Sequence, residues 1–542
     1  MKKSLLFLLI SNFIWAQWSI SNAERSALIN LYNSSNGPTW NRTWDLSKDP
    51  RTWFGVTVKN GDVVQIALNN NALKGVFPSN LALFTKLQKL DLGNNELNGE
   101  VAPSLASLTT LTVLDISNNR LSGDPTSRLS SLSNLEDLSI GGNLFEISDV
   151  NATLQNLPKL KSLNISQLQL TEVPAKISSF TKLQQLDLSN NQIVSGFNRL
   201  APLALLQELN LSNNNLTSIP VEVASMQKLI KLNLSHNNIS NFNNLGNAQA
   251  LEQLNLADNK LDQIPSKITT LPNLLNLNLN QNKIQAGFSS LTQLKNLQQL
   301  SIDENEIRGG FPSELLNMPK LLMLSLRDNH LAGEIPAKLP PICDLSNNRY
   351  NKLAIQRQFM SSSFNYDSFY YSPQRYDSGV DEVLGVLGQP ATLFQSLSGP
   401  DYTFSWYKNL DENMNIGTEN LFFNEVKPED YGFYTVEAYT YSKIFDKVLQ
   451  LSLFREPIKL TNKLGVEDPS KFIKIFPNPT TDFINILATN KKVEKVNIYD
   501  LSGKQVMSSS ATRINVSRLP AGVYMLNIKT DDGIKNFKFI KQ

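Results

Sequence analysis

Histidine and cysteine, the residues that most often build metal and nucleophile sites, are scarce in this chain. They occur only at His236, His330 and Cys343. The two histidines lie about four repeats apart in a recurring Leu-rich pattern, and Cys343 takes a position that Leu fills elsewhere. Catalysis needs titratable groups that converge or a bound metal. We therefore expect no metal site, no cofactor and no catalytic residue, and a single cysteine allows no internal disulfide.

Acidic side chains form the other arrangement that could do chemistry. Asp91, Asp115 and Asp187 share one position of successive L-x-L segments, and Asn210, Asn233, Asn255 and Asn278 continue the column. Carboxylates about 5 Å apart on neighbouring strands could hold Ca²⁺ or act as an acid/base pair. Asp or Asn is also the usual residue of an L-D-L-S-N-N run. We interpret the column as part of that run and predict that the protein is not an enzyme.

A repeat positions these residues. The pattern L-x-x-L-x-L-x-x-N-x-L recurs thirteen times, mostly at spacings of 22–25 residues. Twelve repeats carry Asn, and the repeat Leu160–Leu170 has Leu168 instead. The Asn positions are 71, 95, 119, 143, 191, 214, 237, 259, 282, 305, 329 and 348.

Each repeat predicts one short strand whose alternate Leu side chains point inward. No repeat can bury that face alone, but stacked repeats share a continuous core. The period and pattern resemble the leucine-rich-repeat family. Segments such as Gly75–Pro78 resemble its plant-type variant, and Ile219-Pro220 resembles the bacterial type. The resemblance implies a horseshoe-shaped solenoid with a parallel β-sheet on its concave side, in which the Asn amide bonds to backbone groups of the turn.

Both ends of a solenoid need caps. We expect an N-terminal cap at 17–62, repeats over 63–350, and a C-terminal cap and connector at 351–375. The first cap resembles that of plant-type repeats without its cysteines, and we infer that stacked Trp40, Trp44 and Trp53 rings replace the disulfide.

The sequence of residues 376–459 predicts short β-strands in which apolar and polar residues alternate. Its Phe404–Lys408 and Asp430–Tyr434 motifs resemble an immunoglobulin-like domain, with Trp406 in the core and Tyr434 as the corner tyrosine. The usual cysteines are absent: Val436 takes the second position, and Phe394 or a neighbour takes the first. The fold class expected after the solenoid is thus two small all-β sandwich domains.

A linker at 460–471 leads to a last β domain at 472–542. Over its whole length this domain resembles the C-terminal sorting domain of type IX secretion substrates of Bacteroidetes, which implies type IX secretion machinery as a partner. The residues that carry the resemblance are Pro477, Asn478, Pro479, Gly503, Lys504, Gly522, Tyr524 and Lys538.

Residues 1–16 read as a secretory signal peptide. Two lysines precede a short apolar run, and cleavage is expected between Ala16 and Gln17. No later segment is apolar for long enough to span a bilayer, so we expect no transmembrane segment in the mature chain. We expect a secreted protein or one attached to the outer cell surface.

A net charge of +2 without basic runs argues against nucleic acid as a partner. The fold resemblance implies instead a protein ligand on the concave face. Trp and Tyr are enriched in the hot spots of protein interfaces and in sugar sites, but neither occurs in residues 63–349. Alternatives are therefore an adhesin or spacer that uses the immunoglobulin-like domain, or a polysaccharide-binding accessory protein. The charged residues expected on the face are Lys89, Asp91, Asp115, Asp137, Asp187, Glu208, Lys231, Asp303, Glu304, Arg327 and Asp328.

Overall fold

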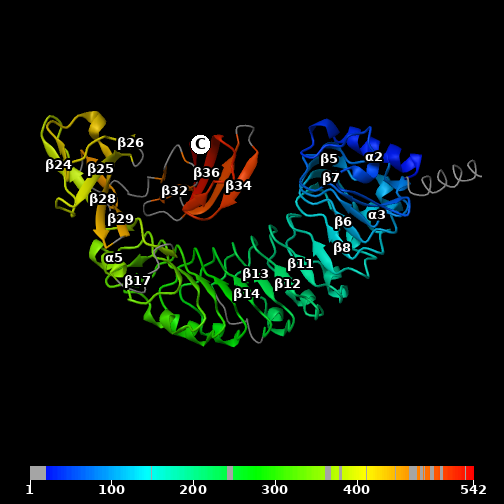
Figure 1. The fold of residues 1–542 in the computed structure, drawn as a ribbon, viewed down its shortest axis with the longest axis horizontal. Coiled ribbons are helices and arrows are strands. Elements are labelled where there is room, and N and C mark those ends of the chain that lie inside the picture. Colours follow the sequence, from blue (N-terminus) through cyan, green and yellow to red (C-terminus); the bar gives the residue numbers. More distant parts are fainter. Residues whose placement is uncertain are drawn as a thin grey trace, which may run out of the picture. The chain divides into compact units, whose positions relative to one another are not determined.

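The computed structural model of the chain describes residues 20–147, 149–240, 248–360, 368–376, 381–409, 412–445, 447–462, 473–476, 480, 483–488, 493–500, 504–530 and 533–541. The chain divides into two compact units, Met1–Leu256 with Pro265–Leu275, and Ala257–Ile264 with Asn276–Gln542. Figure 1 labels the elements of both units. None of the described helices is long and apolar enough to cross a bilayer.

The first unit begins with a cap that is tied to the first repeat. Helix α2 (Asn22–Ser34) starts at Ser21, whose Oγ accepts a hydrogen bond from the Glu24 backbone N–H. One oxygen of the buried Glu24 carboxylate accepts from the Val63 N–H at 3.0 Å. The remaining cap elements are η1 (Gly37–Thr39), η2 (Pro50–Thr52) and the antiparallel hairpin β1 (Val56–Lys59) and β2 (Asp62–Ala67).

Three buried tryptophans fill the cap. The Trp44 and Trp53 rings stack at 4.8 Å between centroids, and Trp40 meets Trp44 edge-on at 4.9 Å. Each indole N–H donates to a backbone carbonyl at 2.8 Å. Aromatic pairs of this kind contribute about 0.5–1.5 kcal/mol beyond their burial. Trp44 and Trp53 therefore stack as the sequence predicts, whereas Trp40 packs edge-on, and this part of the cap contains no disulfide.

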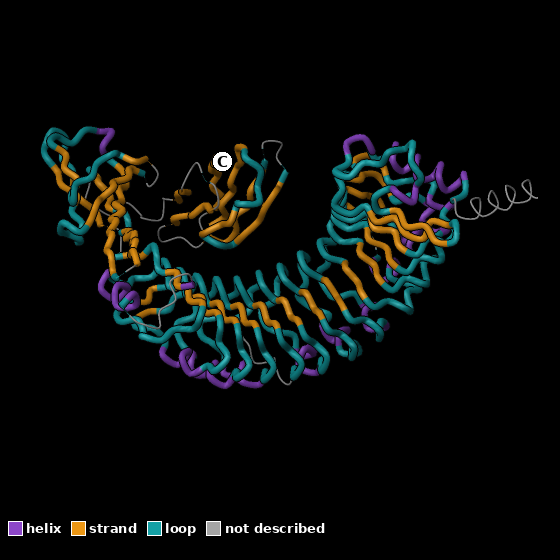
Figure 2. The backbone as a smooth tube through the Cα atoms, viewed as in Figure 1, coloured by secondary structure: helices purple, strands orange, loops and turns teal. Residues whose placement is uncertain are grey.

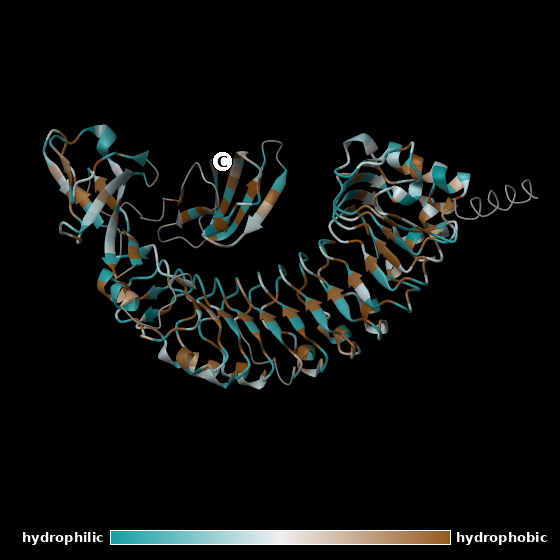
Figure 3. Cartoon of the chain, viewed as in Figure 1, coloured by the Kyte–Doolittle hydropathy of each residue, from teal (hydrophilic) through white to brown (hydrophobic). Residues whose placement is uncertain are grey.

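The repeats of the first unit form a parallel sheet with 3-10 and short α-helices on the other side (Figure 2). Neighbouring strands align Leu with Leu, as in Leu209↔Leu232, and these side chains are buried. Hydrophobic and hydrophilic positions accordingly alternate along the strands (Figure 3). After β2 the strand order is β4 (Lys89–Asp91), β6 (Val113–Asp115), β8 (Asp137–Ser139), β10 (Ser162–Asn164), β11 (Gln185–Asp187), β12 (Glu208–Asn210), β13 (Lys231–Asn233) and β14 (Gln253–Asn255).

The opposite side of the first unit carries the remaining elements. The helices there are η3 (Leu81–Leu83), η4 (Pro103–Ser107), α3 (Thr126–Leu129), α4 (Val150–Thr153), η5 (Ala175–Ser179), η6 (Phe197–Leu200), η7 (Val221–Ser225) and η8 (Ser266–Thr270). The early repeats, where the plant-type motif occurs, add a second small parallel sheet of β3 (Lys74–Val76), β5 (Glu96–Glu100), β7 (Arg120–Gly123) and β9 (Leu144–Phe145). The mixed repeat types therefore differ in structure as well as in sequence.

The second unit continues the same architecture. Its parallel strands are β15 (Asn276–Asn278), β16 (Gln299–Ser301), β18 (Met323–Ser325), β20 (Ile342–Asp344) and β21 (Phe369–Tyr370). A short sheet pairs β17 (Arg308–Gly309) with β19 (His330–Leu331), and the helices are η9 (Phe288–Gln293), η10 (Ser313–Asn317) and α5 (Lys352–Phe359). The predicted solenoid with a parallel sheet is thus present.

The recurring asparagines form a ladder of buried amides. Asn214 Nδ2 donates to three carbonyls, those of Leu188, Leu211 and Ser212, at 3.0–3.2 Å. Its Oδ1 accepts from the Ile193 N–H at 2.9 Å. Asn119, Asn237 and Asn329 repeat this pattern, so each amide joins its own turn to the preceding repeat and satisfies polar groups that water cannot reach. Asn71, at the start of the ladder, bonds instead to the Arg42 backbone of the cap.

Gln374 ends the ladder, which the sequence did not reveal. Its buried side chain donates to the Leu345 carbonyl at 2.8 Å and accepts from the Tyr350 N–H at 3.0 Å. A further ladder asparagine would bond to these same two backbone groups. The segment between the last repeat and Gln374 lacks the Leu spacing, so no repeat motif pointed to this residue.

The following β domain has one large sheet, in the order β22 (Gln374–Arg375), β29 (Lys447–Phe454), β28 (Gly432–Ile444), β25 (Tyr402–Lys408) and β26 (Glu412–Asn413). β28 also pairs with β30 (Ile458–Thr461), which pairs with β23 (Asp381–Leu384), while β24 (Ala391–Leu393) pairs with β27 (Leu421–Phe423). Turn η12 (Pro428–Asp430) precedes β28.

The core of this domain matches most of the predicted roles. Trp406 is fully buried and its indole N–H donates to the Thr418 carbonyl at 2.8 Å. The buried Tyr434 donates its hydroxyl to the Asp430 carbonyl, as a corner tyrosine does. Phe394 is 67% exposed and lies outside the core, where its neighbour Leu393 is fully buried. The immunoglobulin-like assignment itself stays a prediction.

The C-terminal domain is antiparallel. One sheet pairs β31 (Ile473–Phe476), β32 (Phe483–Ala488) and β35 (Arg513–Asn515), and the other has the order β34 (Gln505–Ser509), β33 (Val493–Tyr499), β36 (Gly522–Thr530) and β37 (Gly533–Lys541). Buried Ile, Val, Leu and Phe side chains from both sheets, including Ile484, Ile498 and Phe539, form its core.

Candidate functional site

The strand face, defined as the first and third side chains of the three-residue strands, points away from the Leu core. In the first unit the third positions align Asp91↔Asp115 and Asp187↔Asn210, and the first positions align Glu208↔Lys231. The register therefore places the predicted charged residues of this unit on one surface. Side chains in each column stand on strands about 4.8 Å apart.

Third-position side chains also close the turn that follows each strand. Asp115 Oδ1 accepts from the Ser117 N–H at 2.9 Å and from its hydroxyl at 2.6 Å, and Asp187 Oδ1 accepts from the Ser189 N–H at 2.8 Å. One carboxylate oxygen of Asp115 and one of Asp187 therefore accept hydrogen bonds within the turn. A Cβ at Gly93 would lie 2.7 Å from Asp115 Oδ1, so glycine leaves room for this carboxylate.

We call Asp91, Asp115 and Asp137, on β4, β6 and β8, the acidic cluster. Burial raises the pKa of Asp91, and repulsion from Asp115 raises it further. Burial likewise raises the pKa of Asp137, again with repulsion from Asp115. Lys89 lowers both pKa values, and its Nζ lies 3.3 Å from Asp91 Oδ2. Three carboxylates thus share one neighbouring ammonium, which leaves negative charge on this part of the strand face.

The other predicted residues of the first unit are paired with one another. Glu208 and Lys231 form an ion pair at 2.8 Å, with both side chains exposed. Exposed pairs of this kind contribute about 0–1 kcal/mol. Asp187 Oδ2 accepts from the Asn210 amide at 3.2 Å. Glu208 and Lys231 therefore balance each other's charge, and Asp187 has a neutral amide as its partner.

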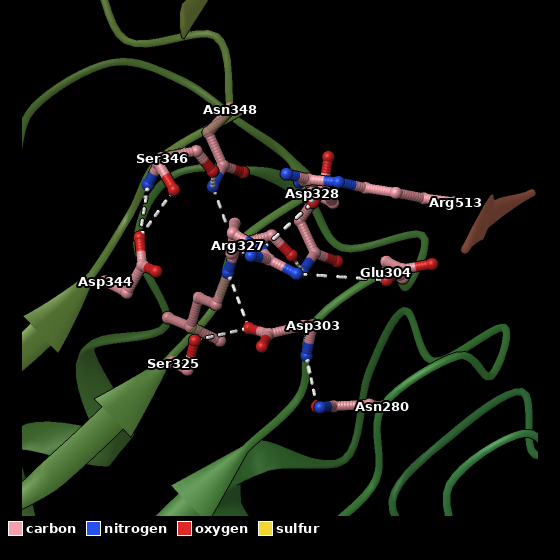
Figure 4. Close-up of polar contacts among 12 residues, drawn as sticks. Asn280, Asp303, Glu304, Ser325, Arg327, Asp328, Asp344, Ser346, Asn348 and Arg513 are labelled. Atoms are coloured by element: carbon pink, nitrogen blue, oxygen red, sulfur yellow. Dashed lines mark hydrogen bonds and ion pairs between the residues drawn. The ribbon is translucent and has the colours of Figure 1, made fainter. Parts of the chain in front are cut away.

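In the second unit the predicted acids lie in the turns that follow the strands. Asp303 is only 9% exposed. It accepts from the Ser325 hydroxyl at 2.5 Å and the Arg327 N–H at 2.8 Å, and its own N–H donates to Asn280 at 2.7 Å (Figure 4). Burial raises the pKa of Asp303 to about 6. Its other oxygen accepts from the Ser301 hydroxyl at 3.3 Å, so both oxygens of the Asp303 carboxylate are bonded within the protein and this residue joins neighbouring repeats.

Glu304 and Asp328 flank Arg327 in a mixed charge network (Figure 4). Arg327 lies 3.1 Å from Asp328 and 3.9 Å from Glu304, and Arg375 lies 3.1 Å from Asp328. Burial raises the pKa of Glu304 to about 7, although Gln281 donates to it at 3.0 Å. Both acids have φ near +53°, a region that Asn tolerates better than Glu. Arg513 also lies 3.1 Å from Asp328, so Asp328 has three arginine partners, and the sequence motif did not predict the parts played by Arg375 and Arg513.

The residues with intrinsic reactivity do not converge. His330 lies in β19, where burial lowers its pKa to about 4, and His236 lies in a turn with φ +56°. Cys343 is buried at a Leu position of β20, and burial raises the pKa of its thiol. Within the described ranges no three His, Cys, Asp or Glu side chains are grouped to hold a metal ion.

Half of the predicted sorting residues can be placed. The Lys504 N–H donates to Asp500 Oδ1 at 3.1 Å, and Lys538 pairs with Met525 across β36 and β37. Tyr524 donates to the Pro520 carbonyl at 2.9 Å, and Gly522 is the first residue of β36. The signal peptide with its Ala16–Gln17 cleavage site and four sorting residues lie outside the described residues: Pro477, Asn478, Pro479 and Gly503.

Three family models match this chain. Two describe leucine-rich repeats, one over residues 204–261 and the other over 86–108, 110–132 and 182–202. The third describes a secretion system C-terminal sorting domain and matches residues 474–542. A search of curated proteins finds no relative. The sorting domain marks proteins that are exported and either secreted or attached to the outer cell surface.

Several solved structures are similar. The leucine-rich-repeat ectodomain of the Arabidopsis receptor kinase HAESA, in complex with a peptide hormone ligand, is 25% identical over 67% of this chain and 62% of its own, with a TM-score of 0.50. A leucine-rich-repeat protein of Leptospira interrogans is 30% identical over 52% of this chain and 72% of its own, with a TM-score of 0.47. This chain spans less than two thirds of the HAESA ectodomain. With its repeats and these family matches, the chain belongs to the leucine-rich-repeat family and ends in a type IX secretion sorting domain.

Proposed function

We propose that this protein is an exported, non-catalytic recognition module whose strand face binds a protein ligand. The ligand presents basic side chains to the acidic cluster. The observation that carries the proposal is that the carboxyl groups of Asp91, Asp115 and Asp137 share a single ammonium neighbour, Lys89. Burial raises the pKa values of Asp91 and Asp137, and repulsion from Asp115 adds to that shift. A Lys or Arg side chain from a ligand would relieve this repulsion, whereas the charges elsewhere on the face already have partners.

The HAESA ectodomain supports the same interpretation, because it shares this repeat fold and was solved with a peptide hormone bound. Fold alone does not determine function, so the acidic cluster supplies the specific argument. Electrostatic complementarity of this kind raises association rates and weakens as salt is added.

A capture experiment tests the proposal. The full chain serves as bait for bacterial and host surface extracts, beside an Asp91→Asn/Asp137→Asn variant that removes two charges and keeps side-chain size. We expect the wild type to retain a discrete protein that the variant loses, with retention that falls as salt rises. Glu222→Gln, a charge removed from η7 on the helix side, is the matched control and should capture normally. Equal capture by both strand-face proteins would exclude the acidic cluster as the binding site.

A further inference from the structure

A groove lined by tyrosines lies where the connector after the repeats meets the following β-sheet. Its walls come from residues 369–372 of the connector and from the paired strands β28 and β29. Its volume is about 380 Å³, within the range of about 300–1,000 Å³ that is typical of small-molecule sites. Its lining shares no residue with the acidic cluster or with the charge network of Figure 4.

The connector wall is fixed at both ends. β21 extends the parallel sheet of the repeats beside β20, and β22 extends the next sheet beside β29. Between them, the Gln450 N–H donates to the Tyr371 hydroxyl at 3.4 Å and the Ser452 N–H donates to Ser372 Oγ at 3.1 Å. The Tyr371 ring also contacts Phe369 at 5.6 Å between centroids. The groove is therefore formed before any ligand arrives, which lowers the entropic cost of binding.

Aromatic and polar side chains alternate along the groove. The register pairs Tyr439 with Ser452 and Tyr441 with Gln450, so each phenol ring stands beside a hydroxyl or an amide. Tyr441 is 63% exposed and Tyr370 on the opposite wall is 54% exposed. These rings offer flat apolar surfaces that the folded chain itself leaves uncovered.

Two buried polar groups support the groove. The Glu437 carboxylate accepts from Ser452 Oγ at 2.5 Å and from the Tyr407 hydroxyl at 3.4 Å, which orients Ser452. Thr440, also in the lining, is 1% exposed, and its hydroxyl has no hydrogen-bond partner among the described residues. An unpaired buried hydroxyl costs about 1–3 kcal/mol. Thr440 lies on the face of β28 opposite to Tyr439 and Tyr441, beside its buried partner Leu451, so its side chain lies beneath the groove.

We propose that this groove binds a neutral saccharide. The lining side chains carry no formal charge, which disfavours nucleic acid and charged peptides. A sugar ring has an apolar C–H face that stacks on tyrosine and a rim of hydroxyls that pair with Gln and Ser. The sequence 63–349 has no Trp or Tyr, so the aromatic platforms absent from the repeats occur at this junction.

Affinity electrophoresis of the full chain tests the assignment. The gels contain hydroxyethylcellulose, xylan, galactomannan or glycogen, and a gel without polysaccharide gives the reference mobility. We expect retardation by at least one glycan, weakened at least tenfold by Tyr441→Ala or Tyr370→Ala and largely kept by Tyr441→Phe. Phe422→Ala, which removes an aromatic ring that is 62% exposed on β27 outside the groove, is the matched control and should bind normally.

Thr440→Val is a second control, because it removes the unpaired hydroxyl on the opposite face of β28 and keeps the shape of the side chain. We expect normal retardation with an equal or higher thermal midpoint. Absence of retardation in every gel, or retardation that survives both tyrosine-to-alanine variants, would overturn the assignment. Capture of a protein through Tyr441 in place of a glycan would overturn it as well.

Discussion

Three consecutive asparagines allow a sharp test of the amide ladder. Asn214 is buried and makes the four ladder hydrogen bonds, whereas its neighbour Asn215 has an exposed side chain. Asn214→Ala and Asn215→Ala therefore remove the same atoms from adjacent positions. We predict a large loss of stability for the first variant and almost none for the second.

The magnitude follows from the partners that are left behind. Each of the three carbonyls bonded to Asn214 keeps a second donor from a neighbouring residue. The buried Ile193 N–H loses the acceptor that Asn214 Oδ1 provides, at a cost of about 1–3 kcal/mol. Three weakened carbonyl contacts and a small void add to this cost. The expected loss is about 3 kcal/mol for Asn214→Ala and less than about 0.5 kcal/mol for Asn215→Ala.

Urea unfolding followed by circular dichroism measures both variants, and hydrogen exchange gives a local readout. The Ile193 amide should lose protection in Asn214→Ala and keep it in Asn215→Ala. If the two unfolding free energies agree within about 0.5 kcal/mol, or if the Ile193 amide stays protected in both variants, the account of the ladder is wrong.

Further predictions concern single side chains. Because burial raises the pKa of Asp303 to about 6, its folded carboxyl keeps a proton that the unfolded chain releases above about pH 4. The stability that this carboxyl provides is thus present below pH 4 and lost by pH 6. In urea unfolding from pH 4 to 7, the unfolding free energy of Asp303→Asn should rise relative to that of the wild type by up to about 3 kcal/mol. His330 has the opposite pH dependence, but it is present in both proteins and cancels in this difference. A difference in unfolding free energy that does not change with pH would contradict this pKa. Tyr434→Phe removes the hydroxyl bonded to Asp430 and should lower the free energy of unfolding by about 1–2 kcal/mol, measured by thermal unfolding. An unchanged free energy of unfolding would contradict the stabilising role given to the corner tyrosine. Leu168→Asn should raise the unfolding free energy by about 1 kcal/mol because it restores a ladder amide, and a loss would mean that this turn cannot hold the amide.

The repeats could be predicted from the sequence because the Leu spacing and the Asn position both follow from one backbone geometry. The same periodicity fixed the column of Asp91 and Asp115, since strand register follows directly from the repeat. The C-terminal sorting domain could be predicted equally well, because each of its motifs lies in a short continuous segment of the sequence. Leu393 shows the limit, because no repeat marks the inward position in a short irregular strand. Its neighbour Phe394 is larger and also apolar, so the sequence did not distinguish the two.

The site could be predicted only in part. Asp303 follows its strand by two residues, and only three-dimensional contacts show that its carboxylate turns inward toward Ser325. Gln374 and Arg375 lie outside every repeat, so no pattern marked their contacts with the last repeats. The tyrosine groove joins residues about 70 positions apart in sequence, such as Tyr370 and Tyr441. Pairing of that kind is set by tertiary contacts that a single sequence does not display.

The central claim is that the strand face beside the acidic cluster contacts a protein ligand, and photo-crosslinking tests it most directly. Val113 lies on β6 in register between Lys89 and Asp137, and Val221 lies on the helix side in η7. A photoreactive benzoylphenylalanine placed at either position reports what touches it when the full chain is mixed with surface extract. The account predicts a discrete crosslinked protein from position 113 and none from position 221. Crosslinking from 221 alone, or from neither position, would contradict it.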